Sequence, residues 1–261
     1  MEYTTLTCER DGTTAVIHLN RPDVRNAFNE TTIAELTAVF TALGAEADLR
    51  AIVLAARGPA FCAGADLNWM KKMAGYTHEE NRADAEQLAE MLRTIYTCPK
   101  PVVAKIQGDC YAGAMGLVAV CDIAVAVEEA YFCLSEVKLG LIPATISPYV
   151  IKAMGEYAAR RYFLTAERFT AQEALRIGFV HTVVKSAELD GAVADLVKHL
   201  TNASPNAVRE AKKLVRDIAG APLNAELIAD TAERIALIRA SEEGREGVRS
   251  FLEKCKPNWL T

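Results

Sequence analysis

The sequence predicts an α/β fold, and three observations indicate it. Short apolar runs typical of buried strands alternate with segments of helical spacing along most of the chain. The last part of the sequence has helical patterns almost throughout. The chain has 261 residues, 51% of them hydrophobic, which is enough for one large core with a C-terminal extension. We therefore expect a core over residues 1–200 and a helical region over residues 201–261.

The first half of the chain supplies most of the predicted strands. Residues 3–8 and 14–19 are expected to form two strands joined by a turn at Asp11-Gly12. A loop rich in Asn, Pro and Arg follows over residues 20–29, and apolar residues at helical spacing predict a helix over residues 30–43. The run at 51–55 is typical of a short buried strand. A small-residue loop at 61–66 leads into a helical turn at 67–70 and a charged helix at 78–97, and the next strand begins at Pro101.

The stretch from Gln107 to Pro143 contains the residues that the other elements of the chain are expected to position. A helix beginning near Gly113 would direct free N–H groups and its positive dipole end at whatever lies in front of it. Such a position suits negative charge that develops on an oxygen atom. Glu136 follows an apolar strand at 131–134 and precedes a turn at 139–143. An oxyanion cradle followed by a single carboxylate predicts proton transfer next to a carbonyl group.

Downstream, the pattern becomes mainly helical. Residues 147–163 are predicted to be helical with a break near Gly155, and Thr170 with Glu173 forms a capping-box sequence for a short helix that ends at Gly178. A short strand is expected over residues 180–184. Ser204 and Pro205 suit the start of a helix, and later helices are placed over residues 205–219, 223–241 and 242–254.

Composition argues against several classes of protein. The net charge is -5 and no basic tract is present, so nucleic acid is a poor default partner. The longest apolar run is interrupted by Asp122, so we expect no membrane span, and the first residues lack a signal-like apolar core. Seven scattered cysteines without CxxC spacing indicate reduced thiols in the cytoplasm. The four histidines show no metal-ligand spacing, so no metal site is expected.

Several motifs resemble those of one enzyme superfamily. FCAGADL, GDCYAGAMGL, CDIAVA and SEVKLGLIP occur in the order typical of the crotonase (enoyl-CoA hydratase/isomerase) superfamily. NRPDVRNAFN, TAERFTAQEALRIGFV and FLEKCKPNW extend the resemblance to nearly the whole chain. The resemblance implies a crotonase-like spiral of ββα units with a C-terminal helical trimerisation region, and assembly as a homotrimer or hexamer. It also implies acyl-CoA substrates and no separate cofactor, since coenzyme A is part of the substrate.

The resemblance also implies the site residues. The backbone N–H groups of Ala65 and Gly113 would hold the thioester oxygen, and Glu136 would be the catalytic acid–base residue. Family hydratases usually carry a second glutamate, at the position that Gly116 occupies here. The residues expected to contact the substrate are Arg25, Ala27, Ala63, Asp66, Leu67, Lys71, Gly116 and Lys138.

Two segments, ADLNWMKKMAGYTHEEN and LGLIPATISPYVIKAMGEYAARRYFLTAERF, are similar to bacterial 3-methylglutaconyl-CoA hydratases. That resemblance implies reversible conversion of 3-methylglutaconyl-CoA to 3-hydroxy-3-methylglutaryl-CoA, in leucine catabolism. The substrate's distal carboxylate would need a partner, because burying an unpaired charge is costly. Lys138, the hydroxyl of Thr145 or Ser147, and the N–H groups after Ser147 are the alternatives.

Other interpretations of the same residues stay open. An isomerase of unsaturated acyl-CoA also needs one base, and an RNA-binding role is known in a eukaryotic relative, although the net negative charge argues against it. Glu136 could be an ordinary surface carboxylate in a salt bridge, but its motif position favours catalysis. Asp66 suits a helix N-cap better than a catalytic role. Cys110 suits the core better than a nucleophilic role, and Asp122 suits a structural ion pair or a cap on a backbone group.

Overall fold

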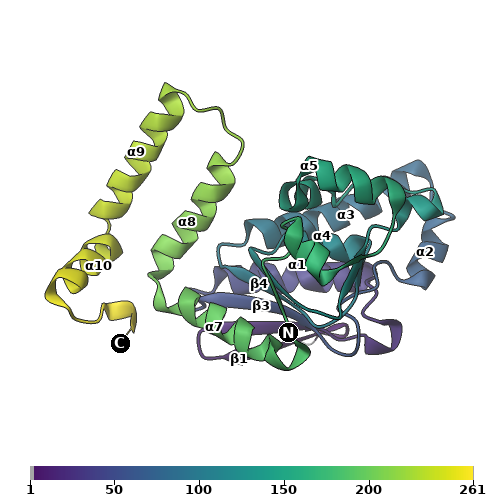
Figure 1. The fold of residues 1–261 in the computed structure, drawn as a ribbon, viewed down its shortest axis with the longest axis horizontal. Helices are drawn as coiled ribbons and strands as arrows, with labels where there is room; N and C mark the ends of the chain where they lie inside the picture. Colours follow the sequence, from purple (N-terminus) through teal and green to yellow (C-terminus); the bar gives the residue numbers. More distant parts are fainter. Residues whose placement is uncertain (1–2, 261) are drawn as a thin grey trace.

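A computed structural model describes residues 3–260, and the body of the protein contains two β-sheets (Figure 1). Residues 1, 2 and 261, at the ends of the two predicted regions, lie outside the described residues. Within residues 3–260 the larger sheet has six strands in the order β1-β2-β3-β4-β6-β9, parallel except for β1 against β2. These strands are β1 (Leu6–Asp11), β2 (Thr14–Leu19), β3 (Ala51–Ala56), β4 (Val102–Ile106), β6 (Ile123–Val127) and β9 (Thr182–Val184).

The smaller sheet lies where the functional loops were expected. Its described strands are β5 (Cys110–Tyr111), β7 (Tyr131–Cys133) and β8 (Phe169–Thr170). Isolated parallel bridges join Cys62 to Cys110 and Phe28 to Ala65, so two more short segments continue this sheet. The strands β2, β3, β4 and β6 are each followed by a segment of the smaller sheet and then by a helix. This repeated order confirms the predicted α/β spiral of ββα units.

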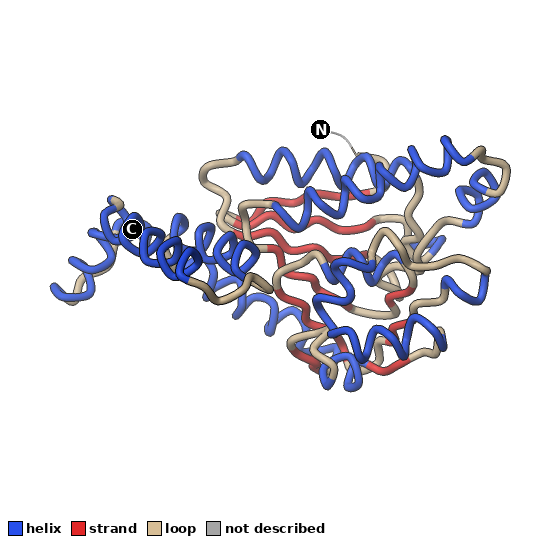
Figure 2. Tube along the Cα trace, turned by 90° about the horizontal axis from the view of Figure 1, so that it is seen from above, coloured by secondary structure: helices blue, strands red, loops and turns tan. Residues whose placement is uncertain are grey.

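Helices cover the sheets and form the C-terminal part of the chain (Figure 2). The α-helices are α1 (Glu30–Ala45), α2 (Leu67–Met73), α3 (His78–Thr97), α4 (Gly113–Ala119), α5 (Ser147–Thr165), α6 (Ala171–Arg176), α7 (Leu189–Asn202), α8 (Pro205–Ile218), α9 (Ala225–Ala240) and α10 (Glu242–Glu253). The short 3-10 helices are η1 (Pro22–Val24), η2 (Glu136–Leu139), η3 (Ser186–Glu188) and η4 (Asn258–Leu260). The core strands β3 and β4 are apolar along nearly their whole length, as strands buried on both faces must be.

Several sequence-based expectations are confirmed in detail. The helix α3 has the predicted bounds and begins with a capping box made by Thr77 and Glu80. The helix α5 breaks at Gly155, whose φ of 78° is easily adopted by glycine. Ser204 caps α8 by accepting a hydrogen bond from the N–H of Ala207. The helices at the C-terminus are therefore where the sequence placed them, while the division of the chain at residue 200 stays a prediction.

The first strand begins and ends later in the chain than predicted. The strand β1 covers Leu6–Asp11, not residues 3–8, because its register pairs Asp11 with Thr14 and leaves only Gly12 and Thr13 in the turn. Thr4 and Thr5 instead donate hydrogen bonds to the carboxylate of Glu35 on α1, from both backbone and side chain. This local alternative satisfies their backbone groups without a strand partner.

The predicted capping box at Thr170 is only half formed. The Thr170 hydroxyl accepts a hydrogen bond from the N–H of Glu173, as expected. The Glu173 carboxylate, however, accepts hydrogen bonds from the Tyr162 hydroxyl at 2.7 Å and from Arg176. A charge-assisted pair with arginine is stronger than a bond back to the cap, so the side chain turns away.

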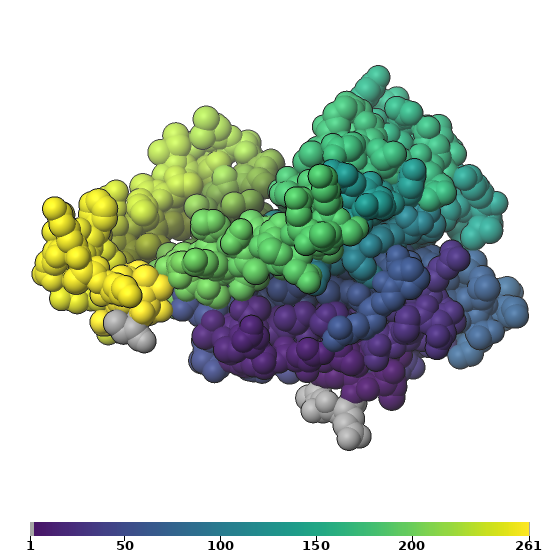
Figure 3. Space-filling model, turned by 60° about the horizontal axis from the view of Figure 1, so that its bottom comes forward, coloured from purple at the N-terminus to yellow at the C-terminus, as the bar shows by residue number. Residues whose placement is uncertain are grey.

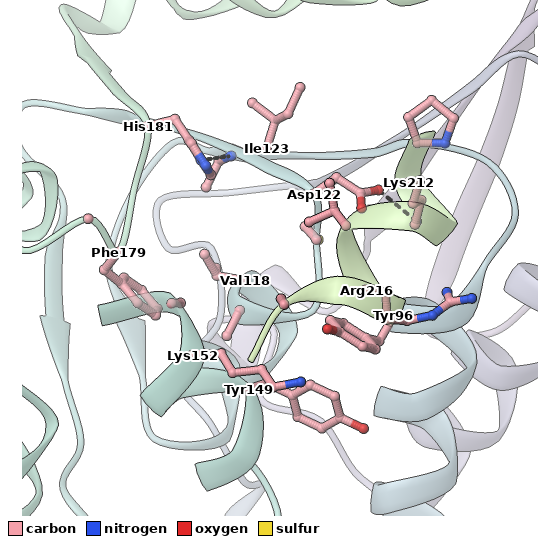
Figure 4. Close-up of a pocket in the computed structure, with 18 of the residues that line it drawn as sticks. Tyr96, Val118, Asp122, Ile123, Tyr149, Lys152, Phe179, His181, Lys212 and Arg216 are labelled. Atoms are coloured by element: carbon pink, nitrogen blue, oxygen red, sulfur yellow. Dashed lines mark hydrogen bonds and ion pairs between the residues drawn. The ribbon is translucent and has the colours of Figure 1, made fainter. Parts of the chain in front are cut away.

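The C-terminal helices project from one side of the body (Figures 1 and 3). Within the described chain, α8 and α9 contain no buried residue. One polar cluster attaches α8 to the core: Lys212 Nζ lies 2.7 Å from Asp122 Oδ2 and 2.9 Å from the carbonyl oxygen of Lys100 (Figure 4). The same Asp122 oxygen accepts a hydrogen bond from the N–H of Val102. Asp122 therefore makes both the ion pair and the backbone cap expected for it.

Residues 3–260 contain neither a membrane-spanning helix nor a cluster of metal ligands. None of the helices in this range is long and apolar enough to cross a membrane. No group of three or more His, Cys, Asp or Glu residues in the same range could hold a metal ion.

We expect Asp122→Ala to lower the free energy of unfolding by about 3 kcal/mol, because it leaves the nearly buried Lys212 ammonium without its partner. The matched control is Glu86→Ala, which removes the partner of Arg82 in a pair on the exposed surface of α3. That control should change stability little, since exposed pairs contribute little. Urea unfolding followed by circular dichroism measures both variants, and equal effects would contradict a special role for the Asp122–Lys212 pair.

Candidate active site

The three predicted catalytic elements follow neighbouring segments of the smaller sheet. The strands β5 and β7 are parallel, with Tyr111 beside Cys133, and the segment at Cys62 runs parallel to β5 on its other side. Gly113 comes after β5, Glu136 comes after β7, and Ala65 comes after the Cys62 bridge. Because these segments run in the same direction, the groups that follow them are brought to one edge of the smaller sheet.

Gly113 begins α4 directly after a strained residue. Ala112 has φ 52° and ψ -125°, a conformation that residues with a side chain rarely adopt. It is held there by a 2.7 Å hydrogen bond from its N–H to the carbonyl oxygen of Cys133. Among the described residues no acceptor receives the N–H of Gly113. This free donor lies at the start of α4, directly after β5, as the candidate oxyanion site requires.

Ala65 is fixed by the residues on both sides of it. Gly64 accepts a hydrogen bond from the N–H of Phe28 at 2.9 Å, and Asp66 donates one to the carbonyl oxygen of Phe28 at 3.0 Å. Asp66 caps α2, as expected, by accepting hydrogen bonds from the N–H groups of Asn68 and Trp69. No acceptor for the N–H of Ala65 exists within the described chain, so a second free donor results.

The Asp66 carboxylate is occupied by structural partners. Besides the α2 cap, it pairs with Arg21, whose Nη2 lies 2.8 Å from Asp66 Oδ2. Burial raises the pKa of Asp66, but the hydrogen bonds from Arg21 and from the α2 backbone lower it more, so the net pKa falls below its usual value. Asp66 is therefore a buried anion that anchors the loop, and its contact with substrate stays a prediction.

Glu136 has the features of an acid–base residue. It lies at the start of η2, half-buried, and its Oε2 atom is buried with no hydrogen-bond partner. Burial raises the pKa of Glu136, and a hydrogen bond from its own backbone offsets this only in part. It makes no ion pair with any residue of the described chain, which removes the surface salt-bridge interpretation. A desolvated carboxyl without a structural partner is typical of a catalytic group.

The place of the second family glutamate is filled by Ile146. A Cβ atom on Gly116 would lie 2.3 Å from Ile146 Cγ2 and 2.8 Å from Ile146 Cβ. Ile146 is buried, so it has no simple route away from this position. Any side chain at residue 116 would thus collide with the core. Gly116 is therefore a packing position, and a glutamate would not fit there without a shift of Ile146.

The residues expected to bind substrate lie in three places. Arg25 and Ala63 line a pocket of about 260 Å³ together with Pro59, Ala60, Asp109 and Tyr111. Ala27 is buried in the same loop as Arg25, while Leu67 and Lys71 are exposed on α2. Lys138 is exposed at the end of η2. Burial and a hydrogen bond to Asp109 raise the pKa of Tyr111 to about 12, so its hydroxyl stays protonated.

The structure narrows the candidates for binding a distal carboxylate. The Ser147 hydroxyl donates to the carbonyl oxygen of Ala144 at 2.7 Å, which occupies its proton. At the start of α5 the N–H groups of Ser147, Tyr149 and Val150 all donate to carbonyl oxygens, and Pro148 has no N–H. Of the four alternatives, the Lys138 ammonium and the Thr145 hydroxyl keep donors that no residue within 3–260 occupies.

A larger cavity lies elsewhere. A space of about 800 Å³ between α8 and the core is lined by Tyr96, Tyr149, Lys152, Phe179 and Arg216 among others (Figure 4). It meets α4 at its C-terminal end and contains none of the predicted site residues. We place the active site at Glu136 because the free donors and the unpartnered carboxyl lie there, and volume alone supplies no chemistry.

Cys110 is a core residue. It is fully buried, and burial raises the pKa of its thiol well above the usual value. The thiolate needed for nucleophilic attack is therefore disfavoured.

Sequence reasoning missed the residues that hold the site together. Arg21, Phe28 and Trp69 act through contacts with residues far away in the chain, such as the 3.0 Å hydrogen bond from Trp69 Nε1 to Asp84. The sequence signals were the NRPDVRNAFN motif, which contains Arg21 and Phe28, and the ADLNWMKKMAGYTHEEN segment, which contains Trp69. Neither indicates the partners of these residues.

Comparisons with known proteins agree with this geometry. The sequence profile of the enoyl-CoA hydratase/isomerase family matches residues 9–261. The enoyl-CoA hydratase ACTT6 of Alternaria alternata is 34% identical over 93% of this chain and 79% of its own. The mevalonyl-coenzyme A hydratase sidH of Aspergillus fumigatus is 32% identical over 94% of this chain and 90% of its own.

The fold agrees equally well. The crystal structure of an enoyl-CoA hydratase from Shewanella pealeana superposes with a TM-score of 0.96 at 44% identity. The superposition covers 99% of this chain and 97% of that one. The chain therefore belongs to the enoyl-CoA hydratase/isomerase family, with the crotonase fold, and is an acyl-CoA hydro-lyase.

Proposed function

We propose that the protein interconverts 3-methylglutaconyl-CoA and 3-hydroxy-3-methylglutaryl-CoA by adding or removing water. The observation that carries the proposal is the buried, unpartnered carboxyl of Glu136, which follows the strand next to that of the Gly113 donor. The reaction needs no cofactor beyond the coenzyme A of the substrate. The free cysteines support a reducing compartment such as the cytoplasm.

In the dehydration direction, the thioester oxygen accepts hydrogen bonds from the N–H groups of Ala65 and Gly113. The Glu136 carboxylate removes the α-proton, and the charge moves onto the thioester oxygen as an enolate. Glu136, now protonated, returns that proton to the departing 3-hydroxyl group, which leaves as water while the double bond forms. Hydration is the reverse. One carboxyl serves both transfers if the proton and the hydroxyl leave from the same face.

One observation supports the branch at C3 of the proposed substrate, and another supports its distal carboxylate. The relative sidH is named for mevalonyl-coenzyme A, a thioester that also carries a methyl and a hydroxyl group on C3. Gly116 removes a carboxylate that would repel an anionic substrate, and Lys138 and Thr145, which follow Glu136 in the chain, keep free donors within residues 3–260. A general enoyl-CoA hydratase is the alternative.

The C-terminal helices support a homotrimer or hexamer. Leu223, Phe251 and Leu252 are between 72% and 85% exposed, and α8 and α9 bury no residue within their own chain. Apolar side chains in such number typically lie against another subunit. We propose that these helices contact neighbouring copies of the chain.

We expect Glu136→Gln to lower kcat by about 10²–10⁴, the usual loss when a general acid–base group is removed. The amide keeps the shape but cannot accept the α-proton. Hydration of the enoyl thioester is followed by loss of its ultraviolet absorbance. The control is Glu128→Gln, which changes an exposed glutamate at the end of β6 and should leave turnover unchanged. Near-normal turnover of Glu136→Gln would remove the assignment.

The same substitution tests the raised pKa without activity. The folded protein favours protonated Glu136, so the carboxylate opposes folding increasingly as pH rises from 4.5 through the raised pKa. Glu136→Gln should therefore raise Tm at pH 8, by about 2–4 °C for each kcal/mol gained, and leave it unchanged near pH 4. A lower Tm at pH 8 would contradict the burial of an uncompensated charge.

We expect kcat/KM for 3-methylglutaconyl-CoA to exceed that for crotonyl-CoA by at least about tenfold, because a hydrogen bond to a charged group contributes about 1.5–3 kcal/mol. Lys138→Met and Thr145→Val should each be tested for loss of this preference. The variant that removes the true partner lowers the ratio without lowering turnover of crotonyl-CoA. Equal or better activity on crotonyl-CoA would favour the general hydratase.

Light scattering at micromolar concentration is expected to give the mass of three or six chains. Replacing Phe251 and Leu252 together by serine should shift the protein toward smaller species, because it removes exposed apolar surface from α10. The control is Val137→Ser, an exposed apolar residue outside the C-terminal helices. A stable monomer in the wild-type protein would overturn the proposal.

A further inference from the structure

Phe28 lies between the two candidate oxyanion donors. Its backbone forms an isolated parallel bridge with Ala65: its N–H donates to Gly64, and its carbonyl oxygen accepts from Asp66. These bonds, 2.9 and 3.0 Å long, flank Ala65 on both sides in the chain. The orientation of the Ala65 N–H is therefore set by the backbone of Phe28.

The ring of Phe28 contacts the second donor. A Cβ atom on Gly113 would lie 2.6 Å from Phe28 Cζ, and the next two nearest atoms also belong to the same ring. Gly113 does not have a positive φ, so its conformation does not require glycine. The ring explains the absence of a side chain at Gly113, and it packs directly on the backbone that carries the second free N–H.

The ring is held in place from the direction of α2. Phe28 is buried, and its ring centroid lies 6.0 Å from that of Trp69. Trp69 is fixed in turn by the cap on Asp66 and by its hydrogen bond to Asp84. The ring is thus confined between Trp69 and the start of α4.

We propose that Phe28 is a positioning residue that sets the separation and direction of both oxyanion donors, one through its backbone and one through its ring. The proposal rests on the function proposed above, in which Ala65 and Gly113 hold the thioester oxygen. Phe28 touches no reacting atom. Shortening its side chain leaves the bonds beside Ala65 intact but frees the backbone at Gly113 to move.

Phe28→Ala is expected to lower kcat by about 10²-fold, since loss or misplacement of one oxyanion donor has effects of this size. KM should change little, because the lost interaction strengthens in the transition state. Phe40→Ala is the matched control: this phenylalanine of α1 is equally buried, and no described ring contact or hydrogen bond of its side chain reaches the site. The control should lose stability but keep kcat.

An infrared measurement reports on the donors without turnover. Hydrogen bonds to a thioester carbonyl lower its stretching frequency, and a saturated acyl-CoA labelled with carbon-13 at the carbonyl binds without reacting. The bound wild-type and Phe40→Ala proteins should show the same lowered frequency. Phe28→Ala, or Phe28→Leu if the alanine variant does not fold, should show a smaller lowering.

A paired substitution tests the contact between the ring and Gly113. Gly113→Ala alone should lower kcat strongly, because its new methyl group overlaps Phe28 Cζ. Adding Phe28→Leu removes that atom, so kcat of the double variant should exceed kcat of Gly113→Ala by at least about tenfold. A coupling of this size is within the range found for residues in contact. Independent, multiplicative effects of the two substitutions would contradict the contact.

The results separate this inference from the proposed function. If the wild-type protein lowers no carbonyl frequency and Glu136→Gln retains its turnover, the proposed function fails. In the other case, the wild-type protein lowers the carbonyl frequency and Glu136→Gln loses turnover. If Phe28→Ala then matches Phe40→Ala in kcat and in carbonyl frequency, only the role of Phe28 is overturned.

Discussion

The structure of the site depends on the lateral pairing of very short segments in the smaller sheet. The pairs at Cys62 and Cys110, and at Tyr111 and Cys133, involve only a few backbone hydrogen bonds each. Each segment alone is too short to be stable, and each is fixed by the long buried strand that precedes it. The large sheet thus stabilises the fold, and strand pairing in the small sheet sets the positions of Ala65, Gly113 and Glu136.

Close packing at two glycines fixes the relative positions of the loops that carry the candidate site. A Cβ atom on Gly108 would lie 2.1 Å from the carbonyl oxygen of Pro59, and one on Gly64 would lie 3.0 Å from that of Tyr111. Neighbouring loops therefore approach each other backbone to backbone. The strained Ala112 adds to this picture, because a conformation of this kind persists only where the surroundings determine it fully.

Much of the fold could be predicted from the sequence, and the reasons are local. The helix at His78–Thr97 has a capping box and helical spacing, and the break at Gly155 has a residue suited to a positive φ. The register of β1 could not be predicted, because it depends on where β2 begins and on the attraction of Thr4 and Thr5 to Glu35. The local sequence pattern does not show which distant residues a segment pairs with.

The same distinction applies to the site. Glu136 and Gly113 could be predicted from motif and neighbouring pattern, since Glu136 follows an apolar strand and Gly113 begins a helix of small apolar residues. For Gly116 the sequence left a packing role and a substrate contact open, and the contact with Ile146, 30 residues along the chain, indicates the packing role. Phe28 was hidden for the same reason: its motif gives its identity, and three-dimensional contact gives its partners.

The packing of Ile146 against Gly116 also limits the chemistry. A hydratase with two carboxylates can divide the work, one group activating water and the other serving the α-carbon. Here the second position is closed by an apolar side chain, so in the proposed mechanism the same carboxyl releases a proton that it has just accepted. Burial raises the pKa of Glu136, and a carboxylate with a raised pKa is a stronger base toward the α-proton than an ordinary one. The burial that leaves Glu136 Oε2 without a partner thus opposes folding, and in the proposed mechanism it is also what lets one glutamate do the work of two.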